Sequence, residues 1–201
     1  TGRLASSSLQ KGELGTSIKQ AEYEYTLYQA TGGSSSSSSS SGSSGSAASA
    51  STWLLTKTTV YPSSVDQTIT QITTYSYTLH DGTLAVKERV TTLPAVSSTE
   101  NGDGSSATRR DVFDLYGNHT WSMDERGYIT RMVYDIPTGA VIQRIDDVDT
   151  ANASGVPAGW TTPSGGGLNL VTDYEVDSQG RTTQVLGPSH EIDLSGTATT
   201  I

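Results

Sequence analysis

Hydrophobic and polar residues alternate along several stretches of the chain. In the run AEYEYTL at 21–27, an alanine, two tyrosines and a leucine occupy one set of alternate positions, and two glutamates and a threonine occupy the other. A spacing of two places each set on one face of a β-strand. The pattern therefore predicts a strand over 21–27 with one buried face and one solvated face.

Two longer runs, 69–79 and 83–93, are rich in threonine, tyrosine, isoleucine and valine. They are joined through His80, Asp81 and Gly82. Asp-Gly between β-rich runs is typical of a two-residue hairpin turn, in which both central residues take a positive φ. We expect a long antiparallel hairpin here.

The most regular feature is an aspartate placed three or four residues before a glycine. It occurs in the segments FDLYG at 113–117, MDERG at 123–127, YDIPTG at 134–139 and YEVDSQGR at 174–181. Such an aspartate can accept hydrogen bonds from backbone amides ahead of it, and the glycine supplies the left-handed residue of a bulged turn. These segments predict a meander of antiparallel strands.

Three stretches lack strand patterns. They are 29–52, which contains eight serines at 34–41; 94–108; and 149–168, which contains three glycines at 165–167. Their compositions favour linkers or surface excursions, because they bring little apolar area to offset the entropy of ordering. We expect residues 1–201 to form a single β-repeat segment of a larger protein, with these three insertions.

Composition supports an all-β, antiparallel fold with a thin core. Hydrophobic residues make up 33% of the chain, and ten tyrosines stand against one phenylalanine. Tyrosine and threonine suit half-buried strand surfaces, where an aromatic ring packs while its hydroxyl stays in water.

Charge and hydropathy exclude several partners. The formal net charge is −9, so the chain should be repelled by phosphate backbones, and nucleic acid is not an expected partner. No apolar run is long enough for a membrane-spanning helix, and no membrane span is expected. The sequence contains no cysteine, which leaves strand pairing and packing to stabilise the fold.

The tyrosine, aspartate and glycine repeats resemble the YD-repeat proteins of the RHS family. The nearest matches are VYDIPTG at 133–139, DSQGR at 177–181 and TGRL at 1–4. The resemblance covers about 111–144 and 173–188, with weaker echoes in the first thirty residues. It implies a spiral of antiparallel hairpins whose strip of sheet closes into a hollow shell or barrel on large bacterial surface and secreted proteins. Some family shells enclose a toxin, but the uneven spacing, the long inserts and the absence of the family's autoproteolytic region here leave toxin encapsulation without support.

The histidines do not indicate an enzyme. His80, His119 and His190 lie far apart, without a companion at the spacing of a metal site or a catalytic triad. His80 is expected beside a turn, and His119 is expected on one strand face with Trp121 and Met123. We predict no catalytic, cofactor-binding or metal-binding residue and no cofactor.

Acidic residues 146, 147 and 149 could in principle offer oxygen ligands to calcium. They lack the regular ligand spacing and the glycine of a recognised calcium loop. Solvated loop charge is the favoured interpretation.

Sugars could be attached to this chain covalently or could bind to it. Asn118 and Asn152 each begin an Asn-X-Ser/Thr acceptor pattern for N-glycosylation. Exposed tryptophans could stack on a sugar; Trp53 and Trp121 lie within strand patterns and are expected in the core, which leaves Trp160 as the candidate sugar contact.

The expected function is structural. A β-repeat segment of a large secreted or cell-surface protein would build an extracellular wall, shell or filament, with neighbouring repeats or identical subunits as its partners. The alternative is an adhesive or carbohydrate-binding module that uses the loops between strands, with glycans as partners.

Overall fold

The computed structural model describes residues 3–10, 12–13, 15–30, 50–189, 191–194 and 197–200. These residues form thirteen β-strands and one short 3-10 helix, so the predicted all-β, antiparallel hairpin array is confirmed. The predicted serine run at 34–41, His190 and the Thr1-Gly2 half of TGRL lie outside the described residues. The chain divides into two compact units, 1–109 and 110–201. The expectation that both are parts of one repeat segment stays a prediction.

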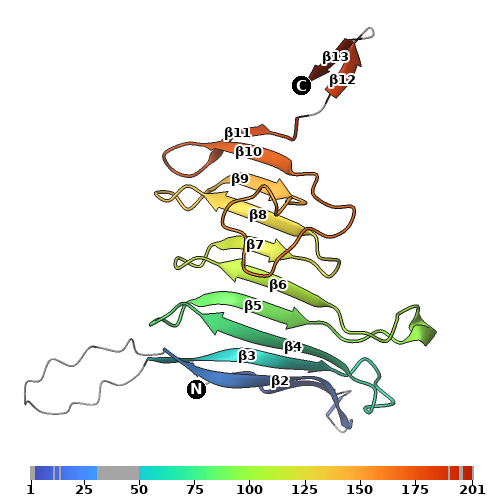
Figure 1. Ribbon diagram of the computed structural model, residues 1–201. Coiled ribbons are helices and arrows are strands. Elements are labelled where there is room, and N and C mark those ends of the chain that lie inside the picture. Colours follow the sequence, from blue (N-terminus) through green and yellow to red (C-terminus); the bar gives the residue numbers. More distant parts are fainter. Residues whose placement is uncertain are drawn as a thin grey trace, which may run out of the picture. The chain divides into compact units, whose positions relative to one another are not determined.

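Unit 1 is a meander in which each strand pairs antiparallel with the next one along the chain (Figure 1). Its strands are β1 (Ser6–Gln10), β2 (Ser17–Gln29), β3 (Ser51–Val60), β4 (Gln71–Leu79) and β5 (Val86–Thr92). The irregular stretch after β5 contains the 3-10 helix η1 (Ser98–Glu100). The predicted strand 21–27 lies inside β2.

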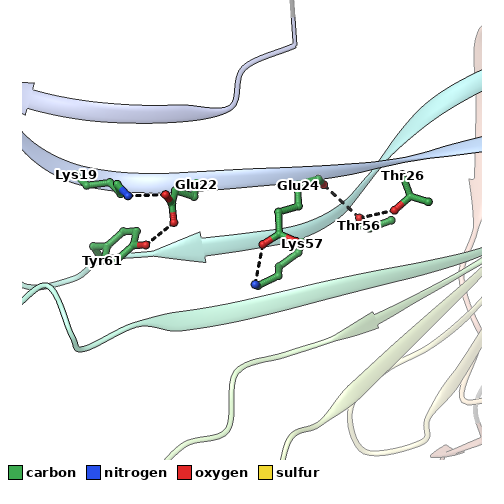
Figure 2. A network of polar contacts seen from close by, with 7 residues as sticks. All are labelled: Lys19, Glu22, Glu24, Thr26, Thr56, Lys57 and Tyr61. Atoms are coloured by element: carbon green, nitrogen blue, oxygen red, sulfur yellow. Dashed lines mark hydrogen bonds and ion pairs between the residues drawn. The ribbon is translucent and has the colours of Figure 1, made fainter.

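The predicted difference between the two faces of β2 is present, but it is less complete than a fully buried face against a fully solvated one. Ala21 is buried, but Leu27 at the far end of the same face is 41% exposed. On the other face the glutamates bind neighbouring side chains (Figure 2). The Lys19 ammonium donates to Glu22 at 2.5 Å, the Tyr61 hydroxyl donates to Glu22, and Lys57 pairs with Glu24 at 2.7 Å. The polar face therefore helps to hold β2 against the strand and loop that follow.

The hairpin between β4 and β5 forms as predicted, but its turn is longer than the Asp-Gly pair implies. The loop spans 80–85, with the His80 amide donating to the Ala85 carbonyl and the Thr83 amide to the His80 carbonyl. Gly82 has a φ of 70°, whereas Asp81 is not among the residues with positive φ. The predicted turn type is wrong because the β-turn at 80–83 needs only one left-handed residue.

Unit 2 continues the same order of antiparallel pairing (Figure 1). Its strands are β6 (Thr108–Phe113), which begins just before the division, β7 (His119–Met123), β8 (Ile129–Tyr134), β9 (Val141–Asp146), β10 (Leu170–Val176) and β11 (Thr182–Leu186). A further hairpin joins β12 (Glu191–Leu194) and β13 (Thr197–Thr200).

Three of the four predicted aspartate–glycine segments form the same turn. In each, one carboxylate oxygen of the aspartate accepts the backbone amides of the second and the fourth residue after it, at 2.8–3.0 Å. The glycine amide donates to the aspartate carbonyl, and the glycine φ lies between 76° and 87°. The aspartates are Asp114, Asp124 and Asp177. The prediction that these residues reverse the chain is confirmed.

The fourth segment reaches the same result with one more residue. The Asp135 carboxylate accepts the amide and the hydroxyl of Thr138, and Gly139 has a φ of 70°. The Asp135 amide donates to the Ala140 carbonyl, which closes the β8–β9 hairpin.

A threonine three residues after the glycine marks a second regularity of these hairpins. Thr120 and Thr183 are the extra residues at the register shifts of their hairpins. Their hydroxyls donate to the Val112 and Glu175 carbonyls across the hairpin, each at 3.2 Å. Thr56 in unit 1 makes the same contact with the Glu24 carbonyl at 3.3 Å. The hydroxyl therefore donates a hydrogen bond to a carbonyl that, at the bulge, would otherwise be hydrogen-bonded only to water.

The core of unit 2 is small and is completed by the segment between β9 and β10. Trp121 and Ile129 from the sheet pack with Val148 and Trp160 from this segment, which Figure 1 shows crossing the strands. The prediction of a surface excursion at 149–168 is therefore wrong: this stretch folds back onto the sheet and buries Trp160 against Trp121 and Ile129.

Hydrogen bonds explain why this segment is ordered. The Asp147 carboxylate accepts the amides of Gly167 and Leu168 at 2.8 and 3.0 Å. Thr150 and Thr162 exchange amide-to-hydroxyl bonds of 2.8 and 3.0 Å. Side chains thus satisfy the backbone of a glycine-rich loop, and the apolar burial offsets the entropy of ordering it.

Replacing Gly117 by alanine tests the left-handed position of the turn. A Cβ atom there would meet no other atom within 4 Å, so the cost is conformational strain alone, about 1–2 kcal/mol. Gly187→Ala is the matched control, because Gly187 also has open space and lacks a positive φ. Urea unfolding should show a clear loss of stability for Gly117→Ala only; equal stability of the two variants would argue against the turn.

Acid should weaken the turn at Asp114. Burial acts to raise the pKa of this carboxyl, but hydrogen bonds from Asn118, Tyr116 and Gly117 outweigh it and hold the pKa below its ordinary value. The stabilisation is therefore fully present above about pH 5 and is lost as the pH falls through the unfolded and then the folded pKa. Asp114→Asn should cost about 1 kcal/mol at neutral pH. Unfolding curves at successive pH values should show this difference shrinking below about pH 4, and a constant difference would contradict the assignment.

Candidate functional site

Unit 2 contains a cleft of about 540 Å³ on the face of β7 and β8. The β6–β7 turn and the β8–β9 turn both contribute lining residues, as do Ser154 and Gly155 of the β9–β10 segment. Both turns are fixed by aspartate hydrogen bonds. The walls of the cleft are thus held in place before any ligand arrives.

The floor combines a cation with aromatic rings. The guanidinium carbon of Arg131 lies 5.2 Å from the centroid of the Trp121 ring, within the range of a cation–π contact. The Tyr134 hydroxyl donates to the His119 carbonyl at 2.9 Å. Burial, followed by the nearby Asp114 charge, raises the pKa of Tyr134, so this hydroxyl stays protonated at neutral pH.

The rim exposes two large apolar side chains. Tyr116 is 83% exposed and Ile136 is 85% exposed, each at the outer part of one aspartate turn. Exposed apolar groups beside a cleft are typical of contact sites for ligands or partners.

The polar groups of the cleft do not form a catalytic arrangement. Among the described residues, Asp114 is the only acidic side chain that lines it, and no histidine does. Both Asp114 oxygens already accept hydrogen bonds, one from two backbone amides and the other from the Asn118 side chain at 2.9 Å. With its pKa lowered, this carboxylate is a poor general base.

A smaller hollow of about 300 Å³ lies under the same segment. It shares Arg131 and Ser154 with the cleft and adds Asn152 and Asn169. Arg131 therefore reaches both spaces.

The structure places the described histidines apart. His80 lies at the β4–β5 turn in unit 1, as expected. His119 shares β7 with Trp121 and Met123, and its ring packs against Phe113 with centroids 5.2 Å apart. Its Nε2 atom lies 3.0 Å from the buried Asp111 carboxylate but lacks the directionality of a hydrogen bond. This histidine–aspartate contact was not predicted, because it depends on cross-strand placement rather than on spacing along the chain.

The aspartates at 146, 147 and 149 accept hydrogen bonds from β8, β9 and the β9–β10 segment. Asp146 accepts three hydrogen bonds from Arg144, at 2.9–3.0 Å, and one from Thr130. Asp147 accepts two backbone amides, and Asp149 accepts the Ala151 amide and the Asn152 side chain. These carboxylates are partly exposed, which agrees with the interpretation as solvated charge, and they also act as structural acceptors. No group of three acidic or histidine side chains suited to a metal occurs in the described part of the chain.

Two of the three tryptophans differ from expectation. Trp121 is buried as predicted, but Trp53 is 45% exposed, with the Arg3 guanidinium 3.9 Å from its ring centroid. Trp160 is only 4% exposed and cannot serve as the predicted sugar platform. Burial of Trp160 results from the fold-back of its loop, which composition alone does not reveal. Tyr116 is the exposed aromatic residue at the cleft instead. Its position inside an aspartate turn is the sequence feature that indicates its exposure.

The acceptor asparagines both donate to aspartates, Asn118 to Asp114 and Asn152 to Asp149. Asn152 is nevertheless exposed on the loop. Across the described residues, no helix has the length and apolar character needed to cross a membrane.

No protein-family model matches this chain, and no curated protein has a significantly similar sequence.

Trp160→Ala tests whether the β9–β10 segment is part of the core. Removing a buried tryptophan should cost about 3–5 kcal/mol through lost burial and a residual cavity. Trp53→Ala is the control, because its ring is largely exposed and its loss should cost far less. Chemical unfolding monitored by circular dichroism gives both values; similar small losses for the two variants would place Trp160 outside the core.

Proposed function

We propose that this chain is a structural, non-enzymatic β-repeat segment of a large secreted or cell-surface protein of the YD-repeat type. It contributes strands to an extracellular wall, shell or filament. Its partners are neighbouring repeats or identical subunits.

The order of the strands is the observation that carries the proposal. From β1 to β5 in unit 1 and from β6 to β11 in unit 2, each strand pairs antiparallel with the next along the chain, so further hairpins can be added without rearranging earlier ones. Nearest-neighbour stacking of this kind is typical of repeat proteins.

A free edge supports association. β11 pairs only with β10 among the described strands, and all five of its residues are exposed. Its second row of backbone amides and carbonyls is therefore available to another strand. Val185 and Leu186 on this strand are 56% and 49% exposed, so the edge is also apolar.

A non-enzymatic role agrees with the side chains of the cleft. Its single carboxylate is committed to a turn, and the described histidines do not line it. The resemblance of the aspartate turns to YD repeats supports the extracellular location.

Self-association of the purified chain tests the proposal. Sedimentation velocity over a range of concentrations should show growth into larger species for the natural chain. Val185→Lys should reduce this growth at least severalfold, because a lysine on an edge strand opposes further pairing.

Ser178→Lys is the matched control, since it adds the same charge in the exposed β10–β11 turn and should leave assembly unchanged. A chain that stays monomeric at every concentration, or two lysine variants that behave alike, would overturn edge-mediated assembly.

A further inference from the structure

We propose that the cleft on β7 and β8 binds a short saccharide bearing a carboxylate, with Arg131 as the charged anchor and Tyr116 as the platform for a sugar ring. This ligand site goes beyond the structural role and does not depend on it.

Arg131 is the first reason. Its guanidinium carries five N–H donors, yet within the described residues it makes no ion pair and no hydrogen bond; its recorded contact is the Trp121 ring. Neighbouring arginines are used differently, since Arg144 binds Asp146 and Arg181 binds Asp177. A half-buried cation without an acceptor fits a ligand that brings one, and a carboxylate matches the guanidinium fork in geometry.

No acidic side chain in the cleft is free to take that place. In the part of the chain that the structure describes, Asp114 is the only carboxylate that lines the space, and its oxygens are occupied by the turn amides and the Asn118 side chain. The positive charge of Arg131 is thus the available charge for a ligand.

The rim points to a sugar. Tyr116 and Ile136 offer exposed apolar surfaces on turns that are already rigid, so that stacking a ring on Tyr116 costs little ordering. Ser154 brings a hydroxyl to the same cleft, and the Thr120 and Asn118 side-chain oxygens there can still accept hydrogen bonds from the hydroxyls of a saccharide, although these side chains already donate to Val112 and Asp114.

Size and net charge limit the ligand. The cleft, at about 540 Å³, falls within the range of small-ligand sites. A net charge of −9 opposes long polyanions, which favours a short acidic saccharide over nucleic acid or a densely charged polymer.

Titration of the whole chain with trigalacturonate, followed by tryptophan fluorescence and calorimetry, tests the inference. The same trisaccharide with its carboxyls methyl-esterified is the matched ligand, because it keeps the rings and loses the charge. The acidic form should bind, and the ester should bind at least about tenfold more weakly.

Two variants assign the contacts. Arg131→Gln should weaken binding of the acidic form about tenfold or more, whereas Arg126→Gln, on the turn at the other end of β7, should leave it unchanged. Tyr116→Ala should weaken both ligands. If Arg131→Gln proves unfolded by circular dichroism, the comparison of acid and ester on the natural chain still decides.

Each other result overturns the inference. Equal binding of acid and ester would leave a sugar site without a role for the charge. Binding insensitive to Arg131→Gln would place the ligand elsewhere, and the absence of binding by either trisaccharide would remove the saccharide site while leaving the structural proposal intact.

Discussion

Unit 2 depends on one interaction: an aspartate carboxylate accepts hydrogen bonds from the backbone amides that follow it in the chain. One oxygen of Asp114, Asp124 or Asp177 accepts two amides, and the glycine between them takes the left-handed conformation. This fixes the turn length and therefore the register. Because strand side chains alternate with a period of two, a slip of the pairing by one residue would move Trp121 and Ile129 to the opposite face.

The same chemistry gives a thin sheet enough core. Asp147, with a φ of 54°, uses its carboxylate to bind the far end of the β9–β10 segment. Val148 and Trp160 are thereby brought onto Trp121 and Ile129. The cleft is a consequence of this arrangement, since two rigid turns and the folded-back segment enclose a space that no strand fills. The proposed structural role and the proposed ligand site thus depend on the same turns.

Much of the fold could be predicted because its signals are local. An aspartate and a glycine three residues apart meet within one turn, and alternation shows which residues share a face. The errors concern distant contacts. Trp53 is exposed and Trp160 is buried, the reverse of the prediction, because burial depends on whether another segment covers the ring. The cleft was not foreseen, since Tyr116, Arg131 and Ser154 come from a turn, a strand and a loop that meet only after folding.

Amide hydrogen exchange of the whole chain, resolved by NMR, tests the central claim most directly. The amides of Asn118 and Tyr128 donate to aspartate carboxylates and should exchange as slowly as those of the adjoining strands β7 and β8. The fast reference is provided by the amides of Ser64 and Gln67 in the 62–70 loop, which donate no hydrogen bond to the described residues, unlike those of Val65, Asp66 and Thr68. If Asn118 and Tyr128 exchanged as fast as that loop, the aspartates would not be closing the turns, and the account of register, core and cleft given above would be contradicted.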